Sequence, residues 1–495
     1  MGIVIKQGFY NTLWLTIGVI IGYVNTILLF PAFLTADQFG LTRVLWAAGT
    51  VFAQFALLGS PQILIKFFPD FGKSVRERGG FFVLMLLIPL LGFVAFFILV
   101  NLFQGQIIHW YANKSTLFSD NFSYLYLITF FFIYFNILEA YLRALLKTTV
   151  ASFLRNVGLR VIWLALIILH YKQIIGFETF LFWFVNAYGI ILVILVIYAL
   201  AIGSLHFSFR LNFIRKKHLK IMAVFGIFVI LGGSATSLAS YIDVLMVGGM
   251  INLKNVAFYS VAFYLGSVIL LPFNGTSNIL IPLISDSFSK NNLKKVKEIY
   301  QDASGNLSLV SMLLFLGIWL NADNIFKILP PEYASGKYVL LFIALAKFFG
   351  ASVGINNFIL QYSPYFKKQL WFNLLFLLLV VVTNLLLIPP LGIVGAALAT
   401  FLSQVIINSL QILYIYMKLK IFPLKINNLK IIVLGGLVYM VVLFIPVQAN
   451  VWVDIVFRSL VIVILYLPAA YFWNISLEYS NQVKKLLRKV IKTGS

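Results

Sequence analysis

The sequence predicts an all-α integral membrane protein that crosses the bilayer fourteen times. Of its 495 residues, 62% are hydrophobic and only 10% are charged, and apolar runs long enough to cross a bilayer follow one another along the chain. A soluble protein of this length cannot bury so much apolar surface. The runs are also too long and unbroken for the strands of a membrane barrel, which leaves a helical bundle.

Polar turns separate the apolar runs and set the predicted helix ends. The first run follows Lys6 and is too long for a signal peptide, so we expect a retained span. The fourteen predicted spans are 8–34, 44–66, 79–103, 122–146, 150–171, 179–202, 221–250, 256–284, 304–322, 337–362, 370–388, 392–417, 430–448 and 453–474.

The basic residues predict the orientation of the chain. If the N-terminus is cytoplasmic and the spans alternate, most of the 37 Lys and Arg residues fall on the cytoplasmic side. Both termini are then expected in the cytoplasm. The same asymmetry accounts for the net charge of +23 without a nucleic-acid partner.

Several chemistries are not indicated by the sequence. There is no cysteine, and the four histidines are scattered without the spacing of metal ligands. Neither a Walker loop nor a nucleophile elbow is present, so we expect no cofactor, no metal and no bond-making enzyme.

The loops are short, and the longest outward one, 104–121, is the size of a small cap. The segment 287–304 is expected to lie on the inner membrane surface, with Phe288, Leu293, Val296 and Tyr300 toward lipid. The basic tail 477–492 has the same character.

An internal copy predicts the domain organisation. GSPQILIKFFPD (59–70) matches GTSNILIPLISD (275–286), and YVNTIL (23–28) parallels YIDVLM (241–246), so that Asn25 stands where Asp243 stands in the second copy. Gly176 and Gly392 are 216 residues apart, the same separation as that between Gly59 and Gly275. A six-helix duplication is parallel, and such transporters bind cargo between the lobes near the midplane. The predicted parts are an N-lobe (1–203), a C-lobe (204–418), two added spans (419–476) and a basic tail (477–495).

Four stretches carry a resemblance to a known family. They are FGLTRVLWAAGTVFAQFALLGSPQILIKFFP (39–69), YIDVLMVGGMINLKNVAFYSVAFYL (241–265), ILIPLIS (279–285) and NLLLIPPLGIVGAALATFLSQ (384–404). The chain resembles the polysaccharide flippase branch of the multidrug/oligosaccharidyl-lipid/polysaccharide (MOP) exporter superfamily. The resemblance implies a MATE-like V of two six-helix lobes plus two C-terminal helices, with spans 1, 2, 7 and 8 lining the cavity.

The resemblance also implies a function. The expected cargo is an undecaprenyl-pyrophosphate-linked oligosaccharide, such as an O-antigen repeat unit, moved from the inner to the outer leaflet of a bacterial cytoplasmic membrane by alternating access. Expected partners are this lipid-linked substrate, the bilayer and other polysaccharide assembly proteins. Coupling to protons, sodium or the membrane potential stays open.

Three alternatives remain beside this interpretation. A multidrug/cation antiporter usually has twelve spans and a carboxylate in span 1, where this chain has Asn25. A lipid II flippase carries arginines in spans 1 and 2, whereas residues 8–34 hold no charge. A membrane-embedded glycosyltransferase or polymerase needs a large outward loop rich in Arg or His, which the sequence does not contain.

Charges inside the spans are the candidate cavity residues. Asp243 lies within span 7, where a carboxylate costs about 2.5–3.5 kcal/mol and is expected to face a wet or protein-lined interior. It is either a site for sugar, proton or sodium or a structural partner of a cation such as Lys347. The other cavity candidates are Asn25, Tyr23, Tyr241, Lys66 and Arg43.

A basic cluster at the inner ends of spans 4 and 5 suggests a landing site for pyrophosphate. Glu139 and Arg143 are four residues apart on one helical face, and Arg155 and Arg160 open the next span. The alternative interpretation is ordinary anchoring by the positive-inside rule.

Overall fold

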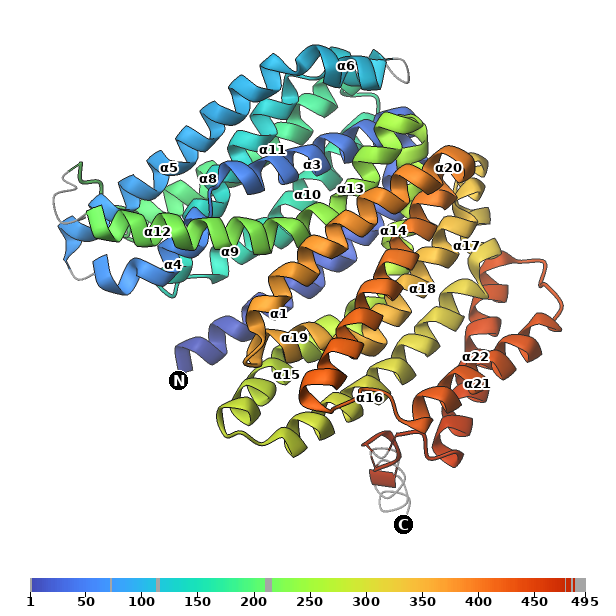
Figure 1. The fold of residues 1–495 in the computed structure, drawn as a ribbon. Helices are drawn as coiled ribbons and strands as arrows, with labels where there is room; N and C mark the ends of the chain where they lie inside the picture. Colours follow the sequence, from blue (N-terminus) through green and yellow to red (C-terminus); the bar gives the residue numbers. More distant parts are fainter. Residues whose placement is uncertain are drawn as a thin grey trace. The chain divides into compact units, whose positions relative to one another are not determined.

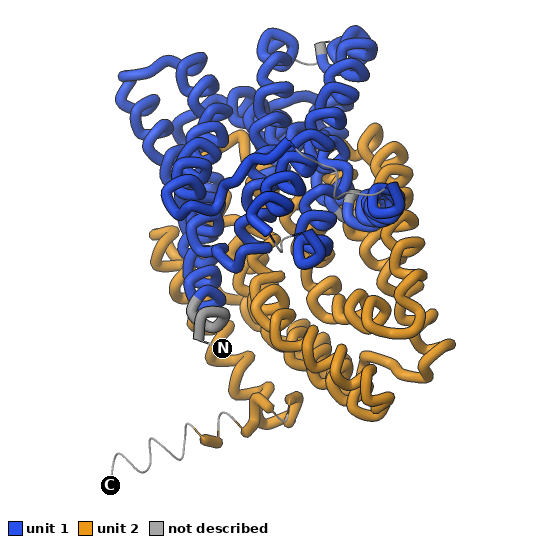
Figure 2. The backbone as a smooth tube through the Cα atoms, turned by 90° about the vertical axis from the view of Figure 1, so that its left-hand side faces the viewer, with its two compact units in different colours: residues 1–260 blue, residues 261–495 orange. Residues whose placement is uncertain are grey.

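The computed structural model describes residues 2–71, 74–112, 116–209, 216–476, 478–481 and 484–485, and the regular secondary structure in these ranges is entirely helical (Figure 1). The predicted tail at 477–495 lies mostly outside the described residues. The chain forms two compact units, residues 1–260 and 261–495 (Figure 2). The unit boundary falls inside α14, because α12 and α13 pack against α4 and α3. The compact units are defined by contacts in the structure, whereas the predicted lobes at 1–203 and 204–418 are defined by the sequence repeat. The units therefore do not test the lobes, which stay predictions.

The first unit holds the predicted spans 1 to 7. Its elements are α1 (Gly2–Tyr23), η1 (Val24–Leu29), α2 (Phe30–Phe33), α3 (Ala36–Ala56), α4 (Ser60–Phe71), α5 (Val75–Leu102), α6 (Gln104–Ala112), α7 (Thr116–Asp120), α8 (Tyr124–Ala144), α9 (Thr149–Phe153), η2 (Leu154–Gly158), α10 (Leu159–Tyr171), α11 (Phe177–Ala201), α12 (Lys216–Val229), η3 (Ile230–Ser234) and α13 (Ala235–Met250). α14 (Leu253–Ser267) leads into the second unit.

The second unit holds the remaining spans around two hydrophobic cores. Its elements are η4 (Val268–Leu270), α15 (Leu271–Ser289), α16 (Leu293–Trp319), α17 (Ala322–Ile328), η5 (Pro331–Gly336), α18 (Lys337–Val353), α19 (Asn356–Tyr362), α20 (Phe366–Leu419), α21 (Ile426–Leu443) and α22 (Val451–Phe472). One core joins α15, α16, α19 and α20, and the other joins α16, α21 and α22.

The described residues contain eleven helices long and apolar enough to cross a membrane, or up to thirteen when each bent helix pair counts as one span. α20 is a single 54-residue helix in this count, although its backbone turns at Gly392 (φ 58°, ψ −137°). The predicted total of fourteen requires the two arms of α20 to span separately, and it stays a prediction.

The second span is bent, and the bend positions the candidate site. Thr35 and Gln38 form a capping box that starts α3. The helix then breaks at Leu58 and Gly59, whose φ angles are 49° and 75°, and α4 continues at an angle of 41° to α3. A positive φ cannot continue a right-handed helix. The break therefore ends α3 in the middle of the predicted span.

Two more irregular segments lie in spans 1 and 5. η1 and η2 are π-helical insertions, each containing one polar residue of interest, Asn25 in η1 and Arg155 in η2. Such insertions rotate the following side chains relative to an unbroken α-helix and are frequent at functional sites.

The prediction of a surface helix over 287–304 is wrong. α15 runs on to Ser289, and α16 begins at Leu293 and continues without interruption to Trp319. Val296 and Tyr300 are fully buried in the core of the second unit, so they do not face lipid. A basic amphipathic pattern is common to surface helices and to the first turns of a membrane span, because both have one wet and one apolar side.

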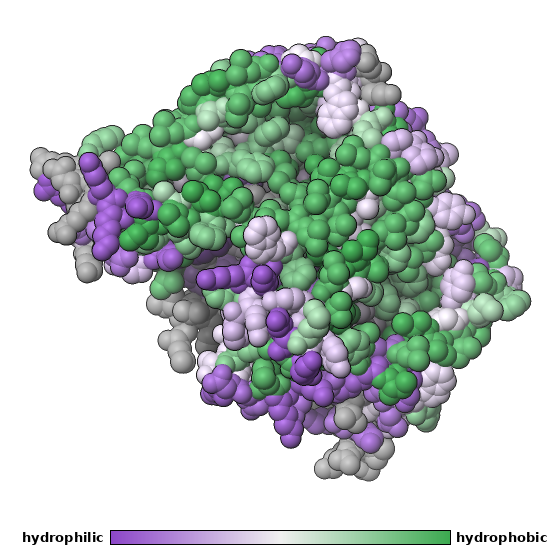
Figure 3. Space-filling view, viewed as in Figure 1, coloured by the Kyte–Doolittle hydropathy of each residue, from purple (hydrophilic) through white to green (hydrophobic). Residues whose placement is uncertain are grey.

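The surface is apolar along the long helices. Figure 3 shows hydrophobic residues over α5 and α20, and hydrophilic residues gathered where α15 turns into α16. On α5, Leu91 is 69% exposed, and on α20, Leu386 is 67% exposed. Apolar side chains so exposed on helices of this length are surface that a bilayer covers. The protein is therefore a multi-pass membrane protein.

Candidate functional site

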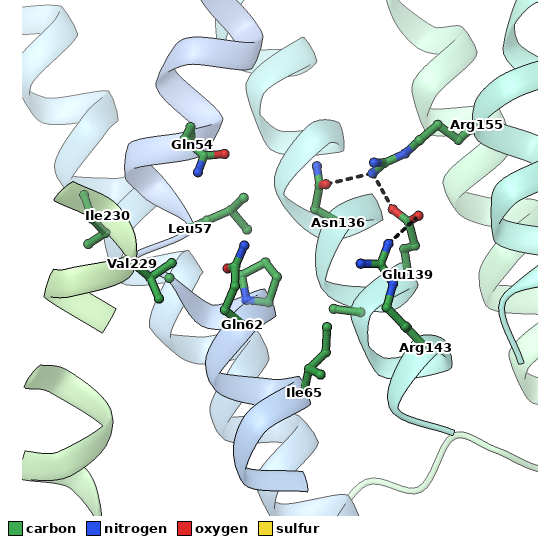
Figure 4. Close-up of a pocket in the computed structure, with 13 residues that line it drawn as sticks. Gln54, Leu57, Gln62, Ile65, Asn136, Glu139, Arg143, Arg155, Val229 and Ile230 are labelled. Atoms are coloured by element: carbon green, nitrogen blue, oxygen red, sulfur yellow. Dashed lines mark hydrogen bonds and ion pairs between the residues drawn. The ribbon is translucent and has the colours of Figure 1, made fainter. Parts of the chain in front are cut away.

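A polar cavity of about 230 Å³ lies inside the first unit. Its walls come from the α3–α4 break, from α8 and η2, and from the junction of α12 and η3 (Figure 4). Its polar lining consists of Gln54, Gln62, Asn136, Glu139, Arg143 and Arg155. Polar side chains in this number are costly within a membrane span unless they face water, ligand or one another, so this cavity is the candidate functional site.

Glu139 holds the two cavity arginines together. Its Oε2 is 2.5 Å from Nη2 of Arg155, and its Oε1 is 3.3 Å from Nη2 of Arg143. Glu139 and Arg143 share one face of α8 because they are four residues apart. Since one carboxylate faces two guanidinium groups, the cluster keeps an excess of one positive charge.

Arg155 is fixed on three sides. Besides Glu139, its Nη2 donates to Oδ1 of Asn136 at 2.7 Å, and its guanidinium lies 5.2 Å from the centre of the Phe135 ring. Asn136 and Glu139 are one turn apart on α8, so a single helix face provides both acceptors. A guanidinium held in this way offers fixed N–H groups, which can donate to two oxygens of one phosphate.

The opposite wall carries two amides. Gln54 precedes the α3–α4 break and Gln62 follows it, and both side chains line the cavity (Figure 4). Irregular backbone at membrane depth is tolerated where it is buried in protein or lines a polar cavity. The break therefore supplies the irregular wall and places Gln54 and Gln62 on the side of the cavity that faces α8.

Arg160 lies outside the cavity lining, in a second polar cluster against α1. Its backbone carbonyl accepts a hydrogen bond of 2.9 Å from Nδ2 of Asn25, which is 1% exposed. A Cβ atom placed on Gly22 would come within 2.9 Å of the Arg160 Nε, so the side chain lies directly over the glycines of α1. Asn25 of η1 thus contacts Arg160 of α10. The sequence around the two residues did not predict this contact.

Tyr188 on α11 connects the two clusters. It is 3% exposed and lies close enough to Arg155, Arg160, Glu139 and Tyr241 to interact with each electrostatically. The landing-site residues predicted from sequence are therefore arranged as one cavity group, Glu139, Arg143 and Arg155, and one deeper residue, Arg160.

Asp243 on α13 faces the protein interior. It is 2% exposed, and the hydroxyl of Tyr259 on α14 donates to its Oδ2 at 2.6 Å. The carboxylate therefore does not look out at lipid. Lys347 belongs to the second unit, where its Nζ lies 4.6 Å from the centre of the Phe263 ring, and its pairing with Asp243 stays a prediction.

The remaining cavity candidates lie outside the cavity lining of the first unit. Arg43 is buried with its guanidinium 5.0 Å from the Phe39 ring, and the Nζ of Lys66 lies 3.9 Å from the centre of the Phe225 ring. Cation–π contacts of this kind stabilise a charge next to apolar helices. Tyr23 is half-buried at the end of α1, and Tyr241 is half-buried on α13.

Comparison with known proteins agrees with this architecture. Residues 229–386 match the MatE family model. A segment of 165 residues is 26% identical to a protein of Haloferax volcanii described as the probable low-salt glycan biosynthesis flippase Agl15, and it covers 33% of this chain but only 35% of that relative. The structure resembles an inward closed conformation of the lipid II flippase MurJ, with a TM-score of 0.73, 15% identity, and coverage of 94% of this chain and 98% of that one.

An inward-facing multidrug MATE transporter of the MOP superfamily has the same fold, with a TM-score of 0.61, 14% identity, and coverage of 84% of this chain and 94% of that one. The chain therefore has the fold that these two transporters share. The segment matched by the MatE model contains Asp243 and Lys347, whereas most of the cavity lining precedes it.

Sequence reasoning missed several polar residues that the structure places at the site. Asn136 is three residues before Glu139, so helical spacing indicates that they share a face. Gln54, Gln62 and Tyr188 gave no such signal, because the first two are brought together by the break and Tyr188 is one of 24 tyrosines. Among the described residues, no group of His, Cys, Asp or Glu could hold a metal ion.

Proposed function

We propose that this transporter flips a lipid-linked oligosaccharide, joined through pyrophosphate to an undecaprenyl carrier, from the inner to the outer leaflet of a bacterial cytoplasmic membrane. The observation that carries the proposal is the pair of arginines, Arg143 and Arg155, held by Glu139 in a polar cavity. The likeness to a probable glycan biosynthesis flippase supports the class of cargo. Polysaccharide assembly proteins that supply and consume the cargo are the proposed partners.

Recognition of the pyrophosphate follows from the charges in the cavity. Without cargo, Glu139 neutralises the charge of one guanidinium and holds the guanidinium groups of both Arg143 and Arg155 in place. A pyrophosphate carries more charge than one carboxylate and accepts several N–H groups at once, so it competes for Arg143 and Arg155. The Gln54 and Gln62 amides can donate to the same oxygens from the opposite wall. Release is favoured because Glu139 stays beside the arginines to replace the departing anion.

Coupling is proposed at Asp243. Its carboxylate is buried and accepts a hydrogen bond from Tyr259, so binding of a proton or a sodium ion there changes the charge of a buried group. A change of that kind shifts an equilibrium between two conformations only if the ion binds one of them better. A multidrug/cation antiporter remains the second candidate function, because a buried carboxylate serves cation exchange equally well.

Removal of one arginine tests the proposed function. In proteoliposomes, Arg155→Gln is expected to slow the flipping of a fluorescent lipid-linked oligosaccharide by about ten- to a hundredfold, because a hydrogen-bonded charge is lost. Arg155→Lys should recover only part of the rate, since lysine keeps the charge but not the fork. Lys290→Gln is the matched control, because Lys290 pairs with Asp286 on the exposed end of α15. A wild-type rate in an Arg143→Gln, Arg155→Gln double variant would reject the proposal.

The proposed orientation has its own test. The distribution of basic residues puts both termini in the cytoplasm. A reporter enzyme that is active only on the non-cytoplasmic side of the membrane should therefore be inactive when it is fused to either terminus. The same enzyme should be active when it is inserted into the α6–α7 segment, within 104–121. Activity at a terminus would contradict the orientation and reverse the proposed direction of transport.

A further inference from the structure

A second hollow of the first unit is almost wholly apolar. It is a groove of about 510 Å³ between α3, α5 and the start of α6. Its lining consists of Phe52, Phe55, Ala56, Leu58, Leu91, Gly92, Ala95, Phe96, Leu99, Val100, Phe103 and Ile107. The groove is larger than the polar cavity and contains no charged side chain in its lining.

The groove has a small-residue floor and aromatic walls. α3 and α5 pack tightly at Ala56 and Gly92, where a Cβ on Gly92 would come 2.1 Å from the Ala56 carbonyl oxygen. This contact closes the floor. Phe52 and Phe96 pack together with ring centres 4.8 Å apart, and Phe103 is 54% exposed at the rim. The groove is therefore built into the helix packing and open at its edge.

The groove and the polar cavity share the α3–α4 break as a wall. Leu57 and Gly59 line the cavity, whereas Leu58, between them in sequence, lines the groove. On α3, Gln54 belongs to the cavity and Phe55 to the groove, so the helix presents opposite faces to the two hollows. At the break the polar and the apolar hollow are separated by the thickness of one chain segment.

We propose that the groove binds the isoprenoid chain of the cargo while the cavity holds its pyrophosphate, with the lipid straddling the α3–α4 break. This assignment rests on the proposed function, because it takes the two hollows as sites for the two ends of one amphipathic molecule. The break is the wall that the two hollows share, since Gly59 lines the cavity and Leu58 lines the groove.

An isoprenoid fits the groove better than a straight acyl chain does. Within a bilayer the hydrocarbon gains nothing from leaving water, so affinity depends on packing and shape. Isoprenoids carry regularly spaced methyl branches and flat double bonds, which pack against the aromatic walls formed by Phe52, Phe55 and Phe96. Phospholipid chains lack these features and compete mainly through their abundance.

Filling the groove tests the proposal. Ala95 on α5 is exposed within the groove, so Ala95→Trp fills it without opening the helix packing. Val94→Trp is the matched control, because Val94 is 46% exposed on the same helix and does not line the groove. The binding of farnesyl pyrophosphate, its straight-chain alkyl analogue and inorganic pyrophosphate is measured on the full chain in nanodiscs.

The expected result is a selective loss of one ligand. The wild type and Val94→Trp should bind farnesyl pyrophosphate more tightly than inorganic pyrophosphate, and Ala95→Trp should weaken only the former, by about tenfold. If the wild type binds the two ligands equally, the isoprenoid site in the groove is wrong and the pyrophosphate site in the cavity is unaffected. If it binds neither ligand, the proposed function is wrong as well. If the alkyl analogue binds as tightly as the isoprenoid and loses the same factor, the groove is a general acyl-chain site and the isoprenoid assignment is wrong.

Discussion

Arg160 lies so close over Gly22 that a Cβ atom on the glycine would come within 2.9 Å of the Arg160 Nε and 3.1 Å of its Cζ. The glycine therefore makes room for an arginine between α1 and α10. Asn25, three residues further on, donates to the Arg160 carbonyl and fixes the backbone of the same residue. Both contacts join span 1 to span 5 inside the first unit, beside the candidate cavity.

Gly22→Ala should displace the Arg160 side chain and slow transport several-fold. The guanidinium is the flexible end of a long side chain, so it can move aside and the fold should persist. Gly8→Ala is the control on the same helix, because nothing lies within 4 Å of a Cβ at that position. Transport rates and unfolding temperatures are measured together, and Arg160→Ala should reproduce the slow transport with normal expression. If Arg160→Ala transports at the wild-type rate, Arg160 is only an anchor.

Gly59→Ala should alter the cavity as well as the backbone. Gly59 has a φ of 75°, and a Cβ there would come 3.0 Å from the Cα of Gly226 on α12. The strain of a positive φ alone costs about 1–2 kcal/mol. Gly203→Ala is the matched control, since Gly203 has a φ of 61° but open space around it. Gly203→Ala should lose stability without losing transport, whereas Gly59→Ala should lose both. Equal transport by the two variants would show that the contact with α12 does not shape the cavity.

The sequence predicted the spans far better than it predicted the site. Every predicted span corresponds to helix in the structure, because exposed backbone is excluded from hydrocarbon. The predicted ends are less accurate, since α16 begins at Leu293 and α20 continues through the predicted gap after residue 388. Glu139 and Arg143 could be paired from their spacing, but the approach of Arg155 depends on the π-helical turn η2. Gln54 and Gln62 depend on the break at Leu58 and Gly59, which the sequence marks with a single glycine. The geometry of the site therefore depends on local breaks in the helices, which helical periodicity in the sequence does not predict.

Asp243→Asn should remove the response of transport to a pH or sodium gradient. The amide is close in size to the carboxylate and can still accept from Tyr259, so the buried contact is kept while the titratable group is lost. Tyr259→Phe is the companion variant, because it removes the hydroxyl and keeps the carboxylate. Initial rates are compared across imposed gradients in proteoliposomes. A wild-type gradient dependence in Asp243→Asn would mean that coupling takes place elsewhere.

Arg458→Met should destabilise the second unit by about 3–5 kcal/mol, because it leaves the Asp454 carboxylate buried without its cation. Arg458 Nε lies 2.7 Å from Asp454 Oδ2, and both side chains are almost fully buried within α22. Asp454 also accepts from Asn324 on α17, and Arg458 donates to the Val442 carbonyl of α21, so the pair ties α17, α21 and α22 together.

A double variant, Asp454→Leu with Arg458→Met, should recover most of that loss, since no charge is then left in the apolar interior. Lys290→Gln removes an equally spaced but exposed pair on α15 and should change stability by less than about 1 kcal/mol. Free energies of unfolding in detergent provide the measurement. A single variant as stable as the double variant would mean that water reaches Asp454, and the pair would then count as part of the solvated surface.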